Sequence, residues 1–298
     1  MILKHKVTII TKTMQDYFVT FAFRKNIAMQ EIEAFESAYA KIMASEVLPM
    51  DKVLRYVAGG KGKRLRPRLV FLSAKLFGEV NDTTRRTALF VEMLHTATLI
   101  HDDVVDGSDT RRDRASVNAR WNNKTAVLAG DHLLSKAVRL LSNPEDHPIL
   151  DEMLDVAMAM SEGELMQNRS QKTEDGRQKD SDSCLLTSDF YLNIIERKTA
   201  RLIRACCLGG ALSVTPHLSP LTSHLISDFG LYLGLVFQMR DDILDNDHPE
   251  TTAWAEKLLP EYLDKALEAL DALTPYIIDK AALASLRELT VFCAERNL

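Results

Sequence analysis

Two short acidic clusters in the chain share the pattern DDxxD, and each follows a run of mostly apolar residues. Their members are Asp102, Asp103 and Asp106 in the first cluster and Asp241, Asp242 and Asp245 in the second. Carboxylates four residues apart share one face of a helix, so they repel each other unless a cation lies between them. Acids at the C-terminal end of a helix also oppose its dipole. We expect both clusters to bind divalent cations, of which Mg2+ fits best because it bridges carboxylates to phosphate oxygens.

The alternative for a single cluster is a solvated helix end that binds no metal, and the presence of two copies favours the metal site. Nearby basic residues then suit a phosphorylated substrate. Lys63 and Arg66 lie in the glycine-containing segment GKGKRLRP, and Arg111 and Arg112 follow the first cluster. Guanidinium groups match diphosphate oxygens, although each charge alone is also typical of a solvated surface. His95 lies about two helical turns before the first cluster, and both a ligand role and a hydrogen-bonded core role stay open for it.

The elements that must position these side chains are helices. Apolar residues recur at i, i+3, i+4 and i+7 along most of the chain. The predicted helices cover residues 29–47, 66–79, 83–106, 124–142, 147–167, 189–213, 221–245, 256–273 and 281–295. The polar segment 170–183 lacks periodicity and is predicted to be a loop. Because no linker marks a boundary, we predict one all-α domain over residues 29–298, with the two helices that end in acidic clusters at its centre.

Residues 1–28 form an N-terminal extension that does not follow this pattern. It combines basic residues with apolar pieces that are too short for the core of a signal peptide. Two interpretations stay open, a weakly amphipathic extension and a translation start upstream of the true one at Met29.

Bulk composition excludes several classes of protein. The 298 residues are 46% hydrophobic and contain no apolar run of about 18 residues, so we predict no transmembrane helix. A formal net charge of −5 argues against a general nucleic-acid-binding protein. The cysteines have neither CxxC nor zinc-ligand spacing, which is typical of idle thiols in a reducing cytoplasm. They are Cys184, Cys206, Cys207 and Cys293.

In the order and spacing of its motifs the chain resembles the trans-type (head-to-tail) polyprenyl diphosphate synthases, in particular their long-chain, octaprenyl-like branch. The motifs are GKGKRLRP, EMLHTATLIHDDVVD, DTRR, AGDHLLSKA, IIERKTARL and FGLYLGLVFQMRDDILD, between Met50 and Asp245. The resemblance implies mostly antiparallel helices around a deep central cavity, a homodimer, and about three Mg2+ ions per active site. It also implies successive condensation of an allylic diphosphate with isopentenyl diphosphate, and transient membrane contact during release of an apolar product.

The resemblance carries roles onto individual residues. The aspartates of both clusters match metal ligands, with Asp102, Asp106 and Asp241 as the chief ones. Arg111 matches the arginine that binds the allylic diphosphate. The residues that match the isopentenyl diphosphate site are Lys63, Arg66, His95 and Arg112. Those that match contacts to the allylic diphosphate and the developing cation are Lys198, Thr199 and Gln238.

Two segments depart from the family pattern. RRDRAS lacks the glycine and proline of the family's RRGxPS, so this loop is expected to differ in shape. After the second cluster, DNDHPETTAWAEKLLP runs almost directly into a helix where the family has a loop with a diphosphate-binding lysine. Lys257 is a candidate substitute for that lysine. Both departures leave open a lower activity or a different closing of the site.

Product length should depend on the residues that precede the first cluster. The growing tail is expected to run from Asp102 toward the N-terminus of the same helix, past Thr98 and Ala97. Both side chains are small, which favours a long product because short-chain members tend to have a bulky aromatic residue there. Candidates for the floor of the channel are Phe90, Val91, Leu94, Met158 and Met160.

Two alternative functions stay open from the sequence alone. A class I terpene cyclase shares the first acidic motif, but it usually has an Asn/Ser/Glu-type second metal motif where this chain has DDILD. A non-catalytic subunit of a prenyl synthase is compatible with the altered loops, but such subunits usually lose one acidic cluster. We therefore rank the active long-chain polyprenyl diphosphate synthase first.

Overall fold

The computed structural model describes residues 29–60, 62–174 and 187–296, and most of them lie in helices. The helices are α2 Met29–Ile42, α3 Leu48–Ala58, α4 Leu65–Phe77, α5 Asp82–Val105, α6 Val117–Arg120, α7 Asn123–Leu140, α8 His147–Glu174, α9 Ser188–Ile195, α10 Arg201–Val214, α11 Pro220–Asp245, α12 Pro249–Ala272 and α13 Lys280–Glu295. Short 3-10 turns cover Pro144–Asp146 and Thr274–Tyr276, and a π-helical turn over Glu196–Ala200 joins α9 to α10. The predicted all-α architecture is confirmed.

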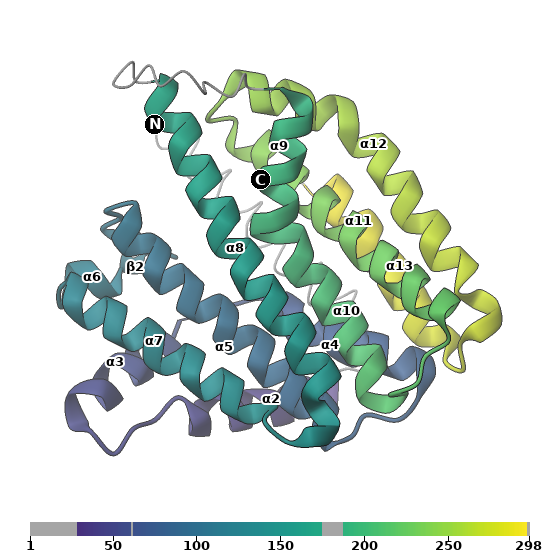
Figure 1. Cartoon of the computed structure of the whole chain (residues 1–298), viewed down its shortest axis with the longest axis horizontal. Coiled ribbons are helices and arrows are strands. Elements are labelled where there is room, and N and C mark those ends of the chain that lie inside the picture. The colour runs from purple at the N-terminus through teal and green to yellow at the C-terminus, as the bar shows by residue number, and fades with distance from the viewer. Residues whose placement is uncertain (1–28, 61, 175–186, 297–298) are drawn as a thin grey trace, which may run out of the picture.

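Helices α5 and α11 carry the two acidic clusters, and both pack against α10 in the interior. Figure 1 shows α5, α8, α10 and α11 running side by side, while α7 covers the outer side of α5 and α12 covers α11. The side chains of Phe90 on α5 and Phe229 on α11 are completely buried. The largely apolar circumference of these two helices therefore predicted their central position correctly.

Two glycines allow α11 to approach the helix beside it unusually closely. A Cβ atom on Gly234 would lie 2.5 Å from the Cα atom of Ala200, and one on Gly230 would lie 2.7 Å from the Cα atom of Arg204. Contacts this short with backbone atoms leave no room for any side chain. The close approach brings the last turns of α11, with the second acidic cluster, against the π-helical turn.

Each acidic cluster occupies the C-terminal end of its helix. Asp106 is the C-cap of α5, and its N–H donates to the carbonyl of Asp102. Helix α11 ends at Asp245, where Asn246 takes a left-handed conformation with φ 49° and its N–H donates to the carbonyl of Asp242. Unpaired carbonyls and carboxylates therefore gather at both ends, which favours the binding of cations there.

A small antiparallel hairpin follows α5, in a segment for which no strand was predicted. It pairs β1, Thr110–Arg111, with β2, Arg114–Ala115. The two turn residues, Arg112 and Asp113, have φ angles of 53° and 62°. Two left-handed residues in succession form the tight turn that matches the twist of paired strands. The segment RRDRAS thus forms a hairpin turn without glycine.

Other sequence predictions differ from the structure at element ends. Helix α3 was not predicted, although Val53 and Leu54 are buried in it. The predicted helix over 29–47 ends at Ile42, and α8 continues to Glu174, into the predicted loop. Apolar periodicity records only buried faces, so it misses short helices and polar helix ends. The N-terminal extension 1–28 and residues 175–186 of that loop lie outside the described residues.

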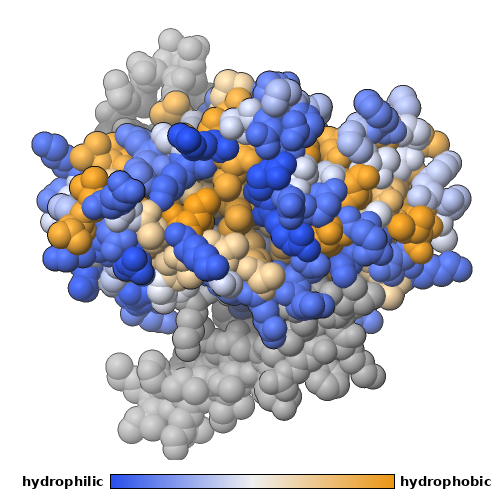
Figure 2. Space-filling view, turned by 90° about the horizontal axis from the view of Figure 1, so that it is seen from below, coloured by the Kyte–Doolittle hydropathy of each residue, from blue (hydrophilic) through white to orange (hydrophobic). Residues whose placement is uncertain are grey.

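Two features bear on contact with a membrane or with solvent, namely the length and hydrophobicity of the helices and the hydropathy of the surface. None of the described helices is both long and apolar enough to cross a bilayer. Seen from below, hydrophobic residues lie in several small groups among hydrophilic ones over the coloured part of the surface (Figure 2).

Candidate active site

Both acidic clusters contribute to one cavity of about 590 Å³, which we call the main cavity. Its walls come from α4, α5, α8, α11, the hairpin and the π-helical turn. The sequence-predicted residues that line it are Arg66, His95, Thr98, Asp102, Arg111, Arg112, Lys198, Thr199, Gln238 and Asp241. The structure thus brings together residues from five separate motifs of the sequence.

The aspartates of the first cluster divide into two roles. Asp103 is buried and accepts two hydrogen bonds from Arg111, at 2.9 Å from Nε and 2.5 Å from Nη2. Within the described part of the chain, the carboxylates of Asp102 and Asp106 have no hydrogen-bond or ion-pair partner. Burial, together with the negative charge of Glu164, raises the pKa of Asp102 to about 6 and also raises the pKa of Asp106. Two carboxylates are therefore available to a cation, and the third holds an arginine.

The second cluster is joined to its neighbours by a chain of hydrogen bonds. Tyr191 Oη donates to Asp242 Oδ2 at 2.6 Å, and Gln238 Nε2 donates to Asp242 Oδ1 at 2.9 Å. Thr199 Oγ1 in turn donates to Gln238 Oε1 at 2.8 Å. Burial raises the pKa of Asp242, which these two hydrogen bonds oppose. Asp245 is exposed at the end of the helix.

Asp241 pairs with a residue that the sequence analysis did not identify. Nη2 of Arg296, just after α13, lies 2.6 Å from Asp241 Oδ1. Burial raises the pKa of Asp241, and the positive charge of Arg296 opposes that effect. The motif resemblance ended at Asp245, so no sequence signal connected the end of the chain with the acidic cluster.

Lys198 lies in the π-helical turn, where two side chains of α8 hold its ammonium group. Its Nζ is 2.6 Å from Glu164 Oε2 and donates to Gln167 Oε1 at 3.0 Å. A Cβ atom on Gly163 would lie 3.0 Å from the backbone N of Lys198, so the absence of a side chain allows α8 to reach the turn. Glu164 and Gln167 were not predicted from the sequence, although their i, i+3 spacing on a helix before a polar segment was a usable signal.

The part of the main cavity lined by Arg66, Arg112 and His95 is cationic. Nε of Arg66 is buried without a hydrogen-bond partner in the described residues, and burial lowers the pKa of this guanidinium. Burial and the charges of Arg66 and Arg112 hold the pKa of His95 well below its usual value, so that the imidazole is neutral near pH 7. Uncompensated guanidinium charge next to a neutral hydrogen-bonding ring suits an anion. Lys63 is exposed and does not line the cavity.

The predicted chain-length residues lie at different depths. Thr98 lines the main cavity, whereas Ala97 belongs to the closed core with 2% of its surface exposed. Met160 also lines the cavity, but Met158 is 59% exposed, so its prediction as a channel floor is wrong. Leu94, one turn below Thr98, is buried in the core, as are Phe90 and Val91. A product tail that runs in this direction meets packed side chains directly below Thr98.

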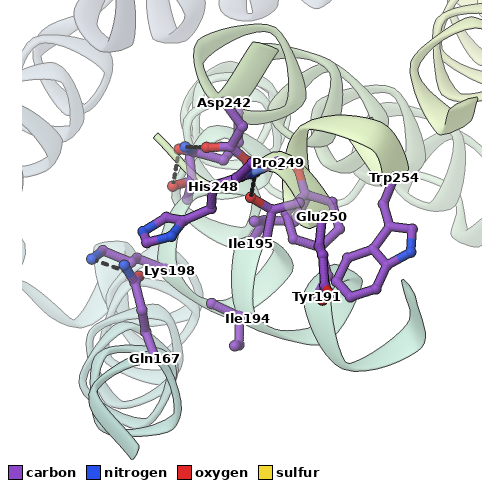
Figure 3. Close-up of a pocket in the computed structure, with 13 residues that line it drawn as sticks. Gln167, Tyr191, Ile194, Ile195, Lys198, Asp242, His248, Pro249, Glu250 and Trp254 are labelled. Carbon is purple, nitrogen blue, oxygen red and sulfur yellow. Dashed lines mark hydrogen bonds between the residues drawn. The ribbon is translucent and has the colours of Figure 1, made fainter. Parts of the chain in front are cut away.

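A second pocket, the side pocket, has a volume of about 320 Å³ and shares Lys198, Thr199 and Gln238 with the main cavity. It lies where α12 begins, four residues after the second cluster. Figure 3 shows the His248 ring pointing into it on the side of Lys198, with the Trp254 and Tyr191 rings opposite. Lys257 is exposed and lines neither cavity, so its role as a substitute for the family's loop lysine stays a prediction.

The side chains of the main cavity form only part of a site for a divalent cation. Among residues 29–60, 62–174 and 187–296, no three His, Cys, Asp or Glu side chains lie close enough together to form a preformed metal site. Asp102 and Asp106 nevertheless supply partnerless oxygen ligands, which hard cations prefer. Mg2+ in particular is held by one or two carboxylates plus waters and substrate phosphates. The first cluster therefore fits a cation that arrives together with a phosphorylated ligand.

The chain is similar in sequence to several known proteins. Residues 48–253 match the sequence model for polyprenyl synthetases. The octaprenyl diphosphate synthase of Escherichia coli is 32% identical over 221 residues, which are 74% of this chain and 64% of that protein. The all-trans-nonaprenyl-diphosphate synthase of Rhodobacter capsulatus, described as geranyl-diphosphate specific, is 36% identical over 72% of this chain and 63% of that protein. The chain thus spans less than two thirds of the length of these curated relatives.

Solved structures share the fold. A polyprenyl synthase from Caulobacter crescentus, crystallised with calcium and isoprenyl diphosphate, superposes with a TM-score of 0.76 at 27% identity, covering 94% of this chain and 98% of that one. A decaprenyl diphosphate synthase from Rhodobacter capsulatus superposes with a TM-score of 0.77 at 23% identity, covering 95% of this chain and 99% of that one.

Proposed function

The chain belongs to the polyprenyl synthetase family, and on that basis we propose that it is a trans-prenyltransferase that condenses an allylic diphosphate with isopentenyl diphosphate. The observation that carries the proposal is the charge layout of the main cavity. Two acidic clusters on α5 and α11 share one cavity with Arg66, Arg112 and a neutral His95. One end suits a cation-associated diphosphate, and the other suits a second diphosphate without a cation.

We propose Mg2+ as the cation, held by Asp102 and Asp106 at the first cluster and by Asp241 at the second. When bound, the ions would neutralise the diphosphate of the allylic substrate and so favour breaking of its C–O bond. Lys198 lies between the two clusters and donates to the same diphosphate once it leaves Glu164 and Gln167. Because negative charge grows on the leaving group, donors aimed at it stabilise the transition state more than the ground state.

The condensation step needs the second substrate to be bound beside the allylic one. Arg66 and Arg112 bind the diphosphate of isopentenyl diphosphate, and the neutral imidazole of His95 donates one further hydrogen bond. The double bond of this substrate attacks the allylic cation left by the departing diphosphate, and transfer of a proton to that diphosphate restores a double bond. Thr199 and Gln238 place side-chain oxygens at the junction of the two clusters, where partial negative charge stabilises the cation.

We propose that Asp103 and Arg111 act as a pair rather than separately. The double hydrogen bond fixes the hairpin against α5, so that Arg111 lines the cavity in a defined position. Asp103 thereby positions the arginine assigned to the allylic diphosphate instead of ligating the metal directly.

We further propose that the product is a long-chain diphosphate. The small side chain of Thr98 at the wall of the main cavity supports this length. The buried side chains below Thr98 must move aside for a tail longer than the cavity holds. The names of several similar proteins, including octaprenyl and nonaprenyl diphosphate synthases, support the same length class.

We propose a homodimer in the cytoplasm, with transient membrane contact when the apolar product leaves. Exposed large apolar side chains on α7 and α8 support the dimer, because such groups commonly mark interfaces. They are Val127, Leu128, Leu154 and Met158. Cys206, Cys207 and Cys293 are free thiols, which supports a reducing compartment. Light scattering of the purified chain tests the dimer, and Leu128→Lys should shift it toward monomer.

The test of the function is an incubation with farnesyl diphosphate, radiolabelled isopentenyl diphosphate and Mg2+, followed by chromatography of the products. We expect a ladder of longer linear diphosphates, and none with Asp102→Asn. Cyclic hydrocarbon, or no incorporation of label by the wild-type chain, would contradict the proposal.

A further inference from the structure

Arg296 has no role in the reaction as derived above, yet it holds the aspartate expected to be the chief ligand of the second cluster. The two clusters differ in this respect. Asp102 and Asp106 have no partner in the described residues, whereas Asp241 has a guanidinium 2.6 Å away. An aspartate paired in this way cannot offer its full charge to a divalent cation at the same time.

The guanidinium of Arg296 makes several contacts besides the ion pair with Asp241. Its Nη2 also donates to the carbonyl of Phe237 at 3.0 Å, and the group stacks on the Phe237 ring with its Cζ 4.3 Å from the ring centre. Nε of Arg240 donates to the backbone carbonyl of Arg296 at 2.7 Å. These contacts anchor the end of α13 on the last turns of α11, against the wall of the main cavity.

The same guanidinium retains capacity for another anion. Its Nε is buried without a hydrogen-bond partner in the described part of the chain, and only 13% of the side chain is exposed. Phe237 and Asp241, which it contacts, both line the main cavity. A diphosphate that enters there brings oxygens that match the guanidinium fork at least as well as a carboxylate does.

We propose that Arg296 is a displaceable counter-ion of the second cluster, a role that rests on the function proposed above. In the free chain it neutralises Asp241, so the first cluster binds divalent cations before the second does. When a diphosphate arrives, Arg296 turns to the diphosphate and releases Asp241 to a cation. The exchange keeps every charge paired, because each anion keeps a cationic neighbour throughout.

The first test measures Mn2+ binding to the full chain, by electron paramagnetic resonance, in the absence of any substrate. Wild type should show one strong class of site, which Asp102→Asn removes. In Arg296→Gln, Mn2+ should bind about tenfold more tightly to the weaker class of site, which is the second cluster. This is the change in affinity that corresponds to removing one partly buried ion pair that competes with the cation. The effect should vanish when Asp241→Asn is added. Arg287→Gln is the matched control, because Arg287 lies on α13, which Arg296 directly follows, and pairs with Asp271 at the surface.

The second test adds inorganic diphosphate at saturating Mn2+. Arg296→Gln should weaken diphosphate binding by about tenfold, although it tightens Mn2+ binding, and Arg296→Lys should recover part of both properties because it keeps the charge. Effects of opposite sign separate a counter-ion from an anchor of α13, whose loss would weaken both ligands. Unchanged Mn2+ binding in Arg296→Gln, weakening of both ligands together, or identical behaviour of the Gln and Lys variants would overturn the proposal. These measurements use inorganic ligands only, so failure of prenyl transfer in the product assay is a separate outcome.

Discussion

Replacing Asp102 by asparagine should stabilise the fold while it removes cation binding at the first cluster. In the described chain this carboxylate is partly buried without a cationic partner, and burial and the charge of Glu164 raise its pKa from 3.8 to about 6. A carboxyl group whose pKa is higher in the folded chain contributes stability below its unfolded pKa, and this stability is lost as the pH rises through about 6. At pH 7.5 the ionised group therefore weakens the fold, and a neutral amide of the same shape relieves the effect.

The size of the effect follows from the two pKa values. The interval from 3.8 to about 6 corresponds to at most about 3 kcal/mol of unfolding free energy. Asp102 faces a cavity open to solvent, and screening reduces this to about 1 kcal/mol. The melting temperature at pH 7.5 should consequently rise by about 2–4 °C in Asp102→Asn.

The assay is thermal unfolding of wild type and Asp102→Asn between pH 5 and pH 8 in the presence of a chelator. The advantage of the variant should shrink toward pH 5, where wild-type Asp102 becomes protonated. Added Mg2+ with inorganic diphosphate should raise the melting temperature of wild type but not of the variant. Asp264→Asn, an exposed change on α12, should alter the unfolding free energy by less than about 0.5 kcal/mol. A variant no more stable than wild type at pH 7.5, or an advantage independent of pH, would refute the electrostatic reasoning.

Three further substitutions test separate parts of the structure. Gly234→Ala should lower the unfolding free energy by about 2 kcal/mol in denaturant titration because its Cβ meets the backbone of Ala200. Helix propensity alone predicts an increase of about 1 kcal/mol, so an increase would contradict the close contact. Tyr191→Phe removes the donor to Asp242 and should lower kcat/KM by at least about tenfold, with little change in melting temperature. Unaltered kinetics would show that this hydrogen bond does not contribute to the reaction. Thr98→Phe should shorten the products seen by chromatography with little loss of stability, whereas an equal stability loss in Thr98→Phe and Ala97→Phe would place both residues in the core.

The sequence predicted the parts of the fold that depend on buried apolar faces. The apolar helices before Asp102 and Asp241 could be placed at the centre because only a central helix is apolar around most of its circumference. Their convergence on one cavity followed from the like charges at both ends, which need a shared partner. The close packing of α11 was not predicted, since Gly230 and Gly234 acquire meaning only from the backbone that faces them.

The remaining features depend on contacts between distant segments or on helix rotation. The pairing of Arg296 with Asp241 joins residues 55 positions apart, and no local pattern encodes it. Ala97 and Thr98 are adjacent, yet only Thr98 faces the cavity, because successive helical residues point about 100° apart. The π-helical turn at Lys198 is a shift in hydrogen-bond register, which leaves no mark in apolar periodicity.

A crystal structure of the chain with Mn2+ and an unreactive allylic thiodiphosphate tests the shared cation site most directly. Anomalous scattering should reveal ions between Asp102, Asp106 and the diphosphate, and a further ion beside Asp241 on the facing wall. Ions absent from both clusters, or a thiodiphosphate bound outside the main cavity, would contradict the shared site and the prenyl transfer derived from it.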